Sequence, residues 1–577
     1  MKNFIYCCLA AMISFILPAC SLDENPQSSL SEKEAFSTSR LIYVNSVASL
    51  YTSIGNMLDG ETTSDVNTLQ ELPSDEAILP GRQGDWVDGG EWQNIFLHNF
   101  ESSVEMYSNC WNYLYQVIGL CNSSIDLLTK VEETNPEAED YIYEVRAIRA
   151  VYYYYAMDLF GQIPLVISSD ESISDVVQSD RSDVFKFVTE ELAACLPHLS
   201  SASSQNAGDY YGRITQAVAY MYMAKCALNA PVYTIDDISR TSYGAFVGDD
   251  LSGTCRASET LGAAVSESGN NISITVDGTA RNAWETVIYC VNKIEGLGYS
   301  LESDYSNNFA VTNNNSRENI FTVPDDDNIY KVWNGDLMRS IHYNHGDAMG
   351  YEGWNGMCAT VQQMKTLDYG KDNQDPRLVL NYYTGTDYTE DTDGELVNDG
   401  ATDKNLEYLP LDVQVDFKAG ADAHIVKCAG ARFKKYKFDK SSSIEGNLNN
   451  DIVIMRYGDA LLMKAEAEYR SGEKPQALID VNRIRMRAGA SPRQILDLND
   501  ILDERAEELA WEGFRRQDQI RFCTFTQPTA DRYEGVWHNA SSGDYNNDAD
   551  GYTVVFPIPY SVINENGNLK QNPGYSI

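Results

Sequence analysis

Helical periodicity in the first and last thirds of the chain constrains its fold more than any other feature. Between residues 109 and 130, five side chains recur at steps of three and four, as on one face of a helix: Trp111, Leu114, Tyr115, Ile118 and Asn122. Similar patterns predict helices over residues 144–160, 181–199, 215–228, 283–296, 454–471, 475–488 and 498–522. The helices come in pairs, which indicates stacked helix–turn–helix units without a repeat of fixed period.

The middle of the chain, residues 299–450, lacks this periodicity. It is rich in Asn, Asp, Gly, Thr and Tyr, a composition typical of loops and short strands. Irregular segments longer than about 15 residues in compact domains are usually functional or disordered, and the aromatic content here argues against disorder. We therefore expect an N-terminal helical part (20–298), a loop-rich insertion (299–450), and a C-terminal helical part with its tail (451–577).

The first twenty residues predict export and lipidation. An apolar run over residues 4–17 follows Lys2 and is shorter than the about 20 residues that a membrane-spanning helix needs. It fits the central part of a secretory signal. The run ends in LPAC, which resembles a bacterial lipobox. We expect residues 1–19 to be a removed signal peptide and Cys20 to carry acyl chains, such as palmitate, that hold the protein on a membrane. The alternative is an ordinary cleaved signal with an incidental cysteine.

The charge balance argues against one class of partner. The chain has 85 acidic and 43 basic residues, a formal net charge of -42, and such a field repels nucleic-acid phosphates. Because 43% of the residues are hydrophobic and 11% aromatic, the composition is that of a folded chain rather than of an acidic disordered one. The twelve cysteines form no CxxC pair, so zinc or redox motifs of that kind are absent from the sequence.

A set of short motifs follows in order over nearly the whole chain. They are SDE at 74–76, GDW at 84–86, GG at 89–90, the helix face at 111–122, EVRA at 144–147, LFGQIPL at 159–165, GRI at 212–214, AWE at 283–285, RYGDALLM at 456–463, AEA at 465–467, NRIR at 482–485, ER at 504–505, EGFRR at 512–516, PIP at 557–559 and QNPGY at 571–575. Each motif is modest alone, but their joint order is specific. Together they resemble the SusD/RagB family, the surface glycan-binding lipoproteins of Bacteroidetes-type bacteria.

This resemblance implies a mainly α fold: a scaffold of TPR-like helix pairs, an α/α superhelix, overlaid by a loop-rich region with short strands. It also implies a cell-surface lipoprotein that binds oligosaccharide or polysaccharide for nutrient uptake. The implied partner is a SusC-like TonB-dependent transporter, to which the glycan is delivered. No catalysis is attributed to the family, so the resemblance implies that the chain is not an enzyme. The implied location is the outer membrane, lipid-anchored and exposed at the cell surface.

Sugar rings present flat CH faces and many hydroxyls, so aromatic side chains on loops beside polar groups are the feature to look for. Three stretches have it: residues 79–92, 325–336 and 342–357. From them we predict seven glycan-binding residues: Arg82, Asp85, Trp86, Trp333, Tyr351, Trp354 and Asn355. In the family, an aromatic in the loop near residues 73–95 often joins the glycan platform, whereas those of the middle region vary in position between members. The alternative is that these rings anchor the long loops onto the scaffold.

Other polar motifs are better explained as architecture. Arg146 and Arg149 lie one turn apart on a predicted helix, and we expect them to meet carboxylates such as Asp459 or Glu466. The charged residues of 504–521 are expected to form structural ion pairs, because no positioned nucleophile or base accompanies them. Helical spacing further predicts three buried tryptophans: Trp111, Trp284 and Trp511.

We expect no cofactor and no metal site. A structural calcium ion is the alternative, because the chain is so acidic. His342 and His345, with Asp347, lie on no single helical face and do not favour a metal site. Residues 546–551, NNDADG, resemble the start of a calcium loop. The twelfth position of that loop is Pro557 instead of the required Glu, so a turn is the default reading.

Two other classes of function stay open at this point. One is a glycoside hydrolase that uses paired carboxylates. The other is a TPR-like module whose ligand is a peptide or protein. New reducing ends from a polysaccharide would indicate the hydrolase, and capture of peptides without glycan binding would indicate the module.

Overall fold

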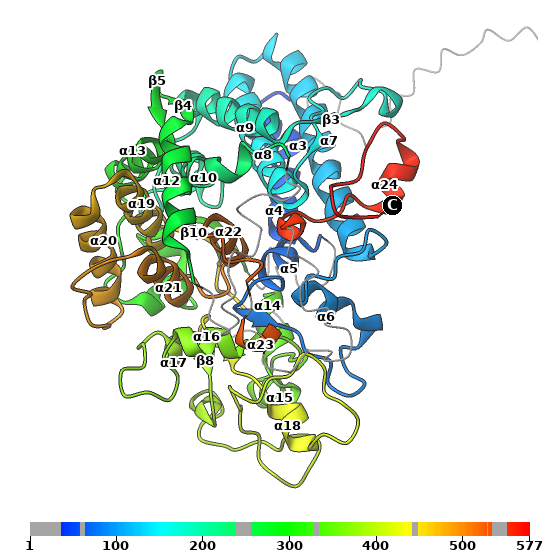
Figure 1. Ribbon diagram of the computed structural model, residues 1–577. Coiled ribbons are helices and arrows are strands. Elements are labelled where there is room, and N and C mark those ends of the chain that lie inside the picture. The colour runs from blue at the N-terminus through cyan, green and yellow to red at the C-terminus, as the bar shows by residue number, and fades with distance from the viewer. Residues whose placement is uncertain are drawn as a thin grey trace, which may run out of the picture.

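The computed structural model describes residues 36–57, 64–237, 256–326, 334–440, 448–527, 529–533 and 551–576. Two long helices, α7 (Glu105–Glu132) and α8 (Ala138–Phe160), lie side by side along the N-terminal side of the molecule (Figure 1). The predicted face of α7 points inward, since Trp111, Leu114 and Ile118 are at most 4% exposed. Gly161, whose φ of 72° suits glycine, ends α8 before Pro164.

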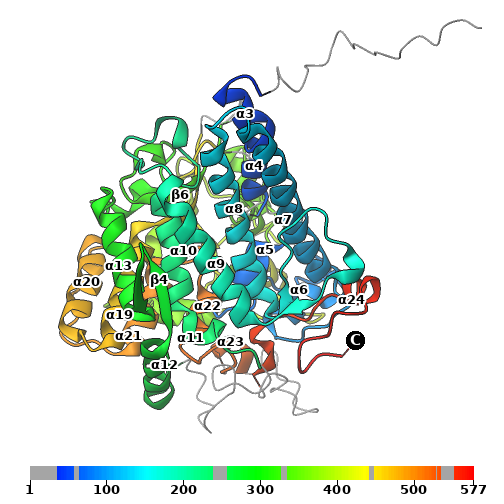
Figure 2. The same cartoon turned by 90° about the horizontal axis from the view of Figure 1, so that it is seen from above.

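From this pair the scaffold continues as a succession of packed helices. Helix α8 packs on α9 (Arg181–Cys195), α9 on α10 (Gln216–Leu228), α10 on α13 (Ala283–Gly296), α13 on α19 (Tyr457–Ser471), and α19 on α20 (Lys474–Arg487). Viewed from above, these helices stand next to one another as a curved wall (Figure 2). The arrangement confirms a mainly α fold built on a TPR-like scaffold of helix pairs. The predicted part boundaries at 298/299 and 450/451 stay predictions.

Smaller helices complete the scaffold. They are α3 (Ser39–Ser46), α4 (Ala48–Asn56), α5 (Val66–Glu71), α11 (Ala230–Tyr233), α12 (Glu259–Asn271), α21 (Leu498–Glu508), α22 (Arg515–Arg521), α23 (Ala530–Tyr533) and α24 (Tyr560–Glu565). Helix α13 begins with a reciprocal capping box between Asn282 and Glu285, the N-terminal signal of helices. In the part of the chain that the structure describes, no helix is both long and apolar enough to cross a membrane.

Two predicted helix boundaries were wrong. The helix predicted from residue 454 begins only at Tyr457, because residues 452–456 form strand β10 (Ile452–Arg456), which pairs with β6 (Asn319–Val323). A β-branched run suits a buried strand, and periodicity alone does not separate the two. The single helix predicted over 498–522 is two helices, broken where Trp511 and Gly513 have φ of 55° and 77°.

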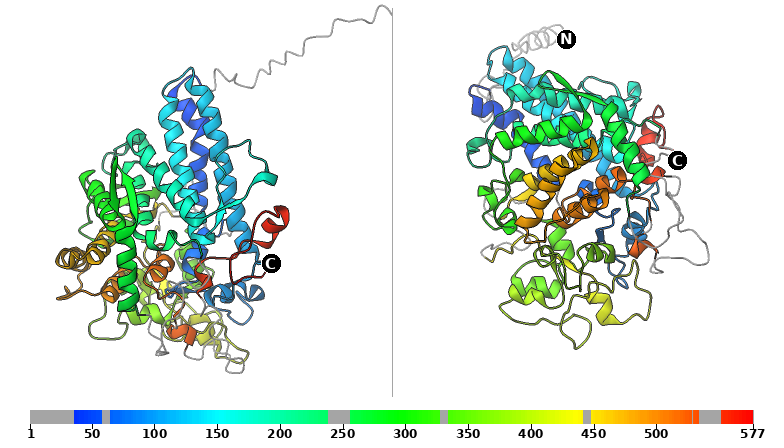
Figure 3. Two further views of the ribbon diagram at one scale, coloured as in Figure 1. Left: turned by 45° about the horizontal axis from the view of Figure 1, so that its top comes forward. Right: turned by 60° about the vertical axis from the view of Figure 1, so that its left-hand side comes forward.

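The loop-rich segments gather at one end of the molecule, the lower end of Figure 1, and the same separation is visible from two further sides in Figure 3. We call residues 77–96 and 334–440 the overlay. Its helices are short: α6 (Glu91–Phe96), α14 (Gly335–Ser340), α15 (Tyr343–Met349), α16 (Val361–Thr366), α17 (Leu378–Asn381) and α18 (Ala423–Cys428). Two antiparallel two-stranded ribbons run through it: β1 (Ala77–Ile78) with β7 (Cys358–Ala359), and β8 (Tyr382–Tyr383) with β9 (Arg432–Phe433).

The remaining strands belong to the scaffold side. Two more antiparallel ribbons lie there: β2 (Ile163–Pro164) with β3 (Gln178–Ser179), and β4 (Ser273–Val276) with β5 (Thr279–Asn282). Among the described residues every sheet has only two strands. Strands therefore fasten loops in this fold, and the main core lies between helices.

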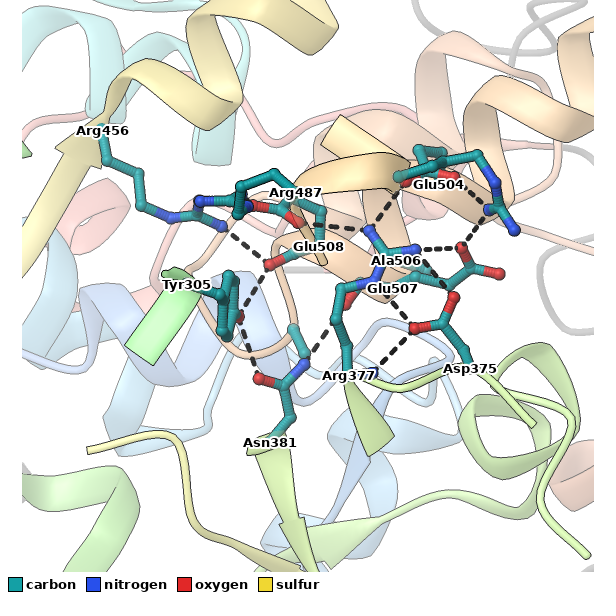
Figure 4. A network of polar contacts seen from close by, with 12 residues as sticks. Tyr305, Asp375, Arg377, Asn381, Arg456, Arg487, Glu504, Ala506, Glu507 and Glu508 are labelled. Atoms are coloured by element: carbon teal, nitrogen blue, oxygen red, sulfur yellow. Dashed lines mark hydrogen bonds and ion pairs between the residues drawn. The ribbon is translucent and has the colours of Figure 1, made fainter. Parts of the chain in front are cut away.

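A buried ionic network joins the overlay to the C-terminal helices (Figure 4). From the overlay, the guanidinium of Arg377 lies 2.7 Å from Glu504, 2.6 Å from Glu507 and 3.1 Å from Glu508. From β10, Arg456 lies 2.6 Å from the same Glu508. We call this set the charged joint: Glu318, Asp375, Arg377, Arg456, Arg485, Arg487, Glu504, Glu507, Glu508 and Glu512. With the separate pairs that Arg505, Arg515, Arg516 and Arg521 form with buried carboxylates, it confirms that the charged residues of 504–521 form structural ion pairs.

The partners predicted for Arg146 and Arg149 were wrong. Both arginines pair with Glu191 of α9, at 2.6 and 3.1 Å. This follows from the packing of α8 directly on α9, while Asp459 and Glu466 lie on α19, further along the wall. The latter two carboxylates pair with Lys225, Arg470, Arg505 and Arg521, of which only Arg470 has helical i, i+4 spacing from its partner, Glu466.

The tryptophans predicted to be buried are buried. Trp111, Trp284 and Trp511 are 4%, 0% and 4% exposed. In the tyrosine run of α8, residues 152–155, Tyr152 and Tyr153 are fully buried in the core. Aromatic residues on helices therefore build the scaffold, which leaves those on loops for other roles.

Candidate functional site

The loop after β1 has an unusual backbone. Ribbon β1–β7 fixes its beginning, and Gly81 bridges to Asp416, whose carboxylate leaves no room for a side chain at that glycine. Six residues of the loop have positive φ, three of them not glycine: Gln83, Gly84, Trp86, Asp88, Gly89 and Gly90. A left-handed conformation costs about 1–3 kcal/mol at a non-glycine residue, and such strain is concentrated at functional sites. The loop is therefore a candidate for function.

Trp86 is held at the surface by this loop. Its φ is 59°, and its ring is half-buried. One edge of the indole lies so close to Gly356 that a Cβ there would come within 2.6 Å of it. Its Nε1 donates a hydrogen bond to the carbonyl of Trp354 over 3.0 Å. The ring thus lies against the overlay with part of its surface open, instead of projecting freely on the flanking glycines.

Two further indoles surround Trp86. The ring of Trp354, also half-buried, has its centroid 6.2 Å from that of Trp86 with the planes tilted by 39°. Trp92 of α6 lies 6.0 Å away in an edge-to-face arrangement and is 7% exposed. We call Trp86, Trp92 and Trp354 the tryptophan cluster. It presents two partly open indoles supported from behind by a third.

The position of Trp354 is set by backbone hydrogen bonds to α14. The amide of Trp354 donates to the carbonyl of Met338 over 2.8 Å, and that of Gly356 to the carbonyl of Arg339 over 2.7 Å. The indole Nε1 of Trp354 donates to Glu352 over 2.7 Å, which fixes the ring as well. A short helix thus supplies the rigid base that an irregular segment cannot provide.

Charged and polar groups lie around the tryptophan cluster. Asp85, with a side chain that is 57% exposed, pairs with Lys427 of α18 at 2.6 Å. The indole of Trp92 donates to Asp88 over 2.8 Å. This is the combination of aromatic faces and hydrogen-bonding groups that the sequence predicted for the site. Lys427 was not predicted, because its helix lies 342 residues from Asp85 in the sequence and its own surroundings carry no aromatic signal.

Arg82, predicted to contact the ligand, is instead 1% exposed. Its guanidinium donates to the carbonyls of Val426, Gly356 and Ala429 over 2.6, 3.2 and 3.0 Å. Burial, followed by repulsion from Arg432, lowers the pKa of Arg82 to about 9. Its donors are used to shape the loops beneath the tryptophan cluster, so Arg82 leaves the set of side chains that a ligand could touch.

Tyr351 and Asn355 are also buried, at 2% exposure each. The ring of Tyr351 packs edge-to-face on Phe438 at 5.5 Å, and burial raises the pKa of its hydroxyl. Asn355, in a left-handed conformation with φ of 50°, receives a hydrogen bond from Arg432 over 2.9 Å. Both residues hold the segment that carries Trp354, which corresponds to the anchoring alternative for these two side chains.

Several predicted residues lie outside the described part of the chain. They are Cys20, Trp333 and residues 546–550 of the calcium-like motif. His342 and His345 are described and fully buried. The ring of His342 accepts a hydrogen bond from the amide of Asn344, and that of His345 contacts the hydroxyl of Tyr408, both at 3.1 Å. These contacts give the two imidazoles structural roles.

Two family models match the chain. One, described as "SusD family", matches residues 317–575, and the other, described as "Starch-binding associating with outer membrane", matches residues 22–228. Among curated proteins, the chain is similar to the starch-binding protein SusD of Bacteroides thetaiotaomicron, with 24% identity over 88% of this chain and 84% of that protein.

Solved structures share the fold over almost the whole chain. A SusD superfamily protein from Bacteroides vulgatus has a TM-score of 0.65 and 18% identity, over 94% of this chain and all of that one. A laminarin-binding SusD-like protein has a TM-score of 0.62 and 19% identity, over 92% and 99%. The family models on both halves, the whole-chain similarity to SusD and the helix-pair scaffold with its overlay agree, and the chain belongs to the SusD family.

Proposed function

We propose that the chain is a cell-surface glycan-binding protein without catalytic activity, and that the tryptophan cluster is its binding surface. The observation that carries the proposal is the pair of half-buried indoles of Trp86 and Trp354, 6.2 Å apart on loops of the overlay. The relatives named for starch and laminarin binding support the substrate class. Of the seven predicted site residues, Trp86, Trp354 and Asp85 are retained, Trp333 stays a prediction, and Lys427 is added.

The geometry suits a sugar chain. The CH face of a pyranose ring packs on an indole, and two indoles tilted by 39° can follow the curvature of an oligosaccharide over neighbouring rings. Asp85 and Lys427 pair at an exposed position, where a surface ion pair contributes about 0–1 kcal/mol and can be opened by sugar hydroxyls. Because the chain has a net charge of -42, neutral glycans should approach faster than polyanionic ones.

Binding at the cell surface would serve uptake. In the proposed arrangement, acyl chains on Cys20 hold the protein on the outer membrane, and the chain closes over a SusC-like TonB-dependent transporter that receives the glycan. A permanent complex of this kind would bury well over about 2,000 Å². Co-purification of the transporter from membranes, without crosslinking, tests this part. Recovery of the chain alone, after mild solubilisation, contradicts it.

Calorimetric titration tests the binding surface. We expect soluble starch or laminarin, as the first neutral probes, to bind the wild-type chain, and Trp86→Ala and Trp354→Ala each to weaken that binding at least tenfold. Val87→Ala is the matched control, since Val87 lies in the same loop and is exposed without joining the cluster. If the Ala variants bind a glycan as tightly as the wild type does, the cluster is not the site.

Two results would replace the proposal by one of the other classes. Release of new reducing ends from these polysaccharides by the purified chain would make it a glycoside hydrolase. Capture of peptides, with no glycan bound from a broad neutral and anionic panel, would make it a TPR-like interaction module. Alginate serves as the polyanionic member of that panel, and we expect it to bind more weakly than the neutral probes.

A further inference from the structure

Three side chains with different metal-binding atoms meet in the overlay, apart from the tryptophan cluster. An oxygen of Asp399, Nδ1 of His424 and Sγ of Cys428 all lie within 4.8 Å of one another. His424 and Cys428 are four residues apart on α18 and so share one face of that helix. Asp399 comes from a separate turn, which the bridge between Asn398 and Asn405 closes. The trio is therefore assembled by tertiary structure from two segments.

Local hydrogen bonds hold the carboxylate of Asp399 and the start of α18, which carries the other two side chains. The carboxylate of Asp399 accepts hydrogen bonds from the amides of Ala401 and Thr402 over 3.0 and 2.7 Å. The amide of His424 donates to Asp422, the N-cap of α18, over 2.9 Å. Exposure is low, at 0% for Asp399, 9% for His424 and 0% for Cys428. Ligands held this way lose little freedom when an ion binds.

The same contacts exclude a nucleophilic triad. In a Cys–His–Asp triad the acid binds one ring nitrogen and the nucleophile the other. Here Asp399 lies 2.7 Å and Cys428 lies 3.6 Å from the same atom, Nδ1 of His424. Three such atoms gathered within 4.8 Å of one another suit a coordination site instead.

We infer that Asp399, His424 and Cys428 bind a divalent metal ion of the zinc class. A mixed oxygen, nitrogen and sulfur set is typical of zinc, with four-coordinate tetrahedral geometry. With Zn–S of about 2.3 Å and Zn–N of about 2.0 Å, a tetrahedral ion places sulfur and nitrogen about 3.6 Å apart. The observed separation between Sγ and Nδ1 is 3.6 Å. The ion would replace the proton between Nδ1 of His424 and the carboxylate of Asp399, which now lie 2.7 Å apart. A tetrahedral ion places such a nitrogen and oxygen about 3.3 Å apart, so the oxygen would move away by only about 0.6 Å.

Charge is balanced at this site. One carboxylate and one thiolate match a divalent ion, and a neutral imidazole adds none. Burial raises the pKa of the Cys428 thiol, but a coordinating ion deprotonates a thiol outright. A water molecule would take the fourth position of the ion. The ion would join the turn around Asp399 to α18. The same helix carries Lys427, which pairs with Asp85 beside the tryptophan cluster. The inference does not depend on the proposed glycan binding.

Cobalt substitution tests the site on the untagged full chain. After treatment with EDTA, we expect one equivalent of Co²⁺ to bind with a thiolate-to-cobalt charge-transfer band and visible bands of tetrahedral intensity. Zn²⁺ should displace it. Cys428→Ser should abolish the charge-transfer band and weaken Zn²⁺ binding at least tenfold, and His424→Asn should do the same. Comparison of far-ultraviolet circular dichroism and metal-free thermal midpoints shows whether the variants fold.

Cys358→Ser is the matched control. Cys358 is a fully buried cysteine of the same overlay and belongs to no such group of donors among the described residues. It should leave the band unchanged. The inference is overturned if the wild-type chain shows no charge-transfer band at stoichiometric Co²⁺, or if Cys428→Ser keeps the band. Calcium held by oxygen ligands elsewhere in the chain gives no such band, so it cannot mimic the expected result.

Discussion

Buried arginines have different partners in two regions of the molecule: carboxylates in the charged joint, and backbone carbonyls beneath the tryptophan cluster. In the joint, the fully buried Arg456 pairs with carboxylates. It lies 2.6 Å from Glu508 (Figure 4) and 2.7 Å from Glu318. Under the cluster, Arg82 and Arg432 are equally buried, and no described carboxylate pairs with either. Both are bound by backbone carbonyls, with Arg432 donating to Ala429 and Gly430 over 2.6 and 2.8 Å.

The difference follows from what the neighbouring backbone needs. A helix satisfies its own carbonyls, so the arginines beside scaffold helices are available for carboxylates. A buried loop leaves carbonyls without donors, and a guanidinium supplies five N–H groups in a fixed plane. The end of α18 and the residues after it, 426–430, also leave carbonyls without helical partners, and Arg82 and Arg432 donate to them together. Arginine thus neutralises charge in the joint, whereas beneath the tryptophan cluster it supplies the hydrogen bonds that secondary structure would otherwise provide.

Removing one carboxylate of the joint should have the largest effect on stability. Glu508→Ala leaves the guanidiniums of Arg377, Arg456 and Arg487 without a shared partner in a buried place. Breaking a buried pair in this way costs about 3–5 kcal/mol. Urea unfolding followed by circular dichroism measures the loss. As a control, Glu190→Gln removes a carboxylate that is 68% exposed and should change stability by less than about 1 kcal/mol. Equal losses in the two variants would contradict the role of the joint.

Removing an arginine from beneath the tryptophan cluster should lower the stability by less than Glu508→Ala does, and its effect should stay local. Arg82→Met leaves carbonyls of Gly356, Val426 and Ala429 without their donor, at about 1–3 kcal/mol, while it also relieves the burial of an unpaired charge. Hydrogen exchange should rise around residues 423–430 and 354–358 and stay unchanged in α7 and α8. Exchange that rises equally in the overlay and in the scaffold helices would show that both unfold as one unit. The arginines beneath the tryptophan cluster would then have no local role.

Mild acid should act differently on His345 of the overlay and on Glu508 of the charged joint. Burial, followed by the charge of Lys434, lowers the pKa of His345 to about 3, below the ordinary 6.5. The folded state therefore binds a proton at His345 less readily than the unfolded chain does, and this group alone lowers stability by about 2 kcal/mol between pH 7 and pH 5. Burial also lowers the pKa of His342 to about 3, which adds to the loss. In the joint, the arginines outweigh burial and hold the pKa of Glu508 well below its usual range, so this carboxylate stays ionised over the same interval.

Replacing the imidazole isolates the contribution of His345. His345→Asn should flatten the loss of stability between pH 7 and pH 5 relative to the wild type, as measured by urea midpoints at both values. His198→Asn, at a ring that is 27% exposed, is the control and should keep the wild-type slope. An unchanged dependence of stability on pH in His345→Asn would show that His345 does not cause the loss of stability in acid.

The smallest effect is expected from the contact that seats Trp86. Gly356→Ala adds a Cβ that would lie 2.6 Å from the indole, so the ring must shift. On the proposed function we expect a tenfold loss of glycan affinity, about 1.4 kcal/mol, with little loss of global stability. Tryptophan fluorescence should change in parallel. Gly296→Ala, where an added Cβ meets nothing within 4 Å, is the control. Unchanged fluorescence in Gly356→Ala would show that the loop absorbs the added methyl group.

The residues that were misassigned or missed show what the sequence could not predict. Arg82 stood near Trp86 in a glycine-rich loop, and that context could not reveal that its carbonyl partners lie between 274 and 347 residues further along the chain. Arg149 was given the wrong carboxylate because helix packing order, and not helix spacing, decides which partners meet. Lys427 carries no local signal at all. In each case the missing information was a contact between distant segments.

By itself the sequence determined the helices, the family, the burial of the helical tryptophans and the placement of Trp86 and Trp354 on irregular segments. These follow from periodicity, composition and motif order, which act over a few residues or through the order of short matches. Only the tertiary structure decided that Trp86 and Trp354, 268 residues apart, share one surface, and that Asp399 meets His424 and Cys428. Loops have no periodicity to constrain their partners, so long-range packing and hydrogen bonds to distant carbonyls choose them.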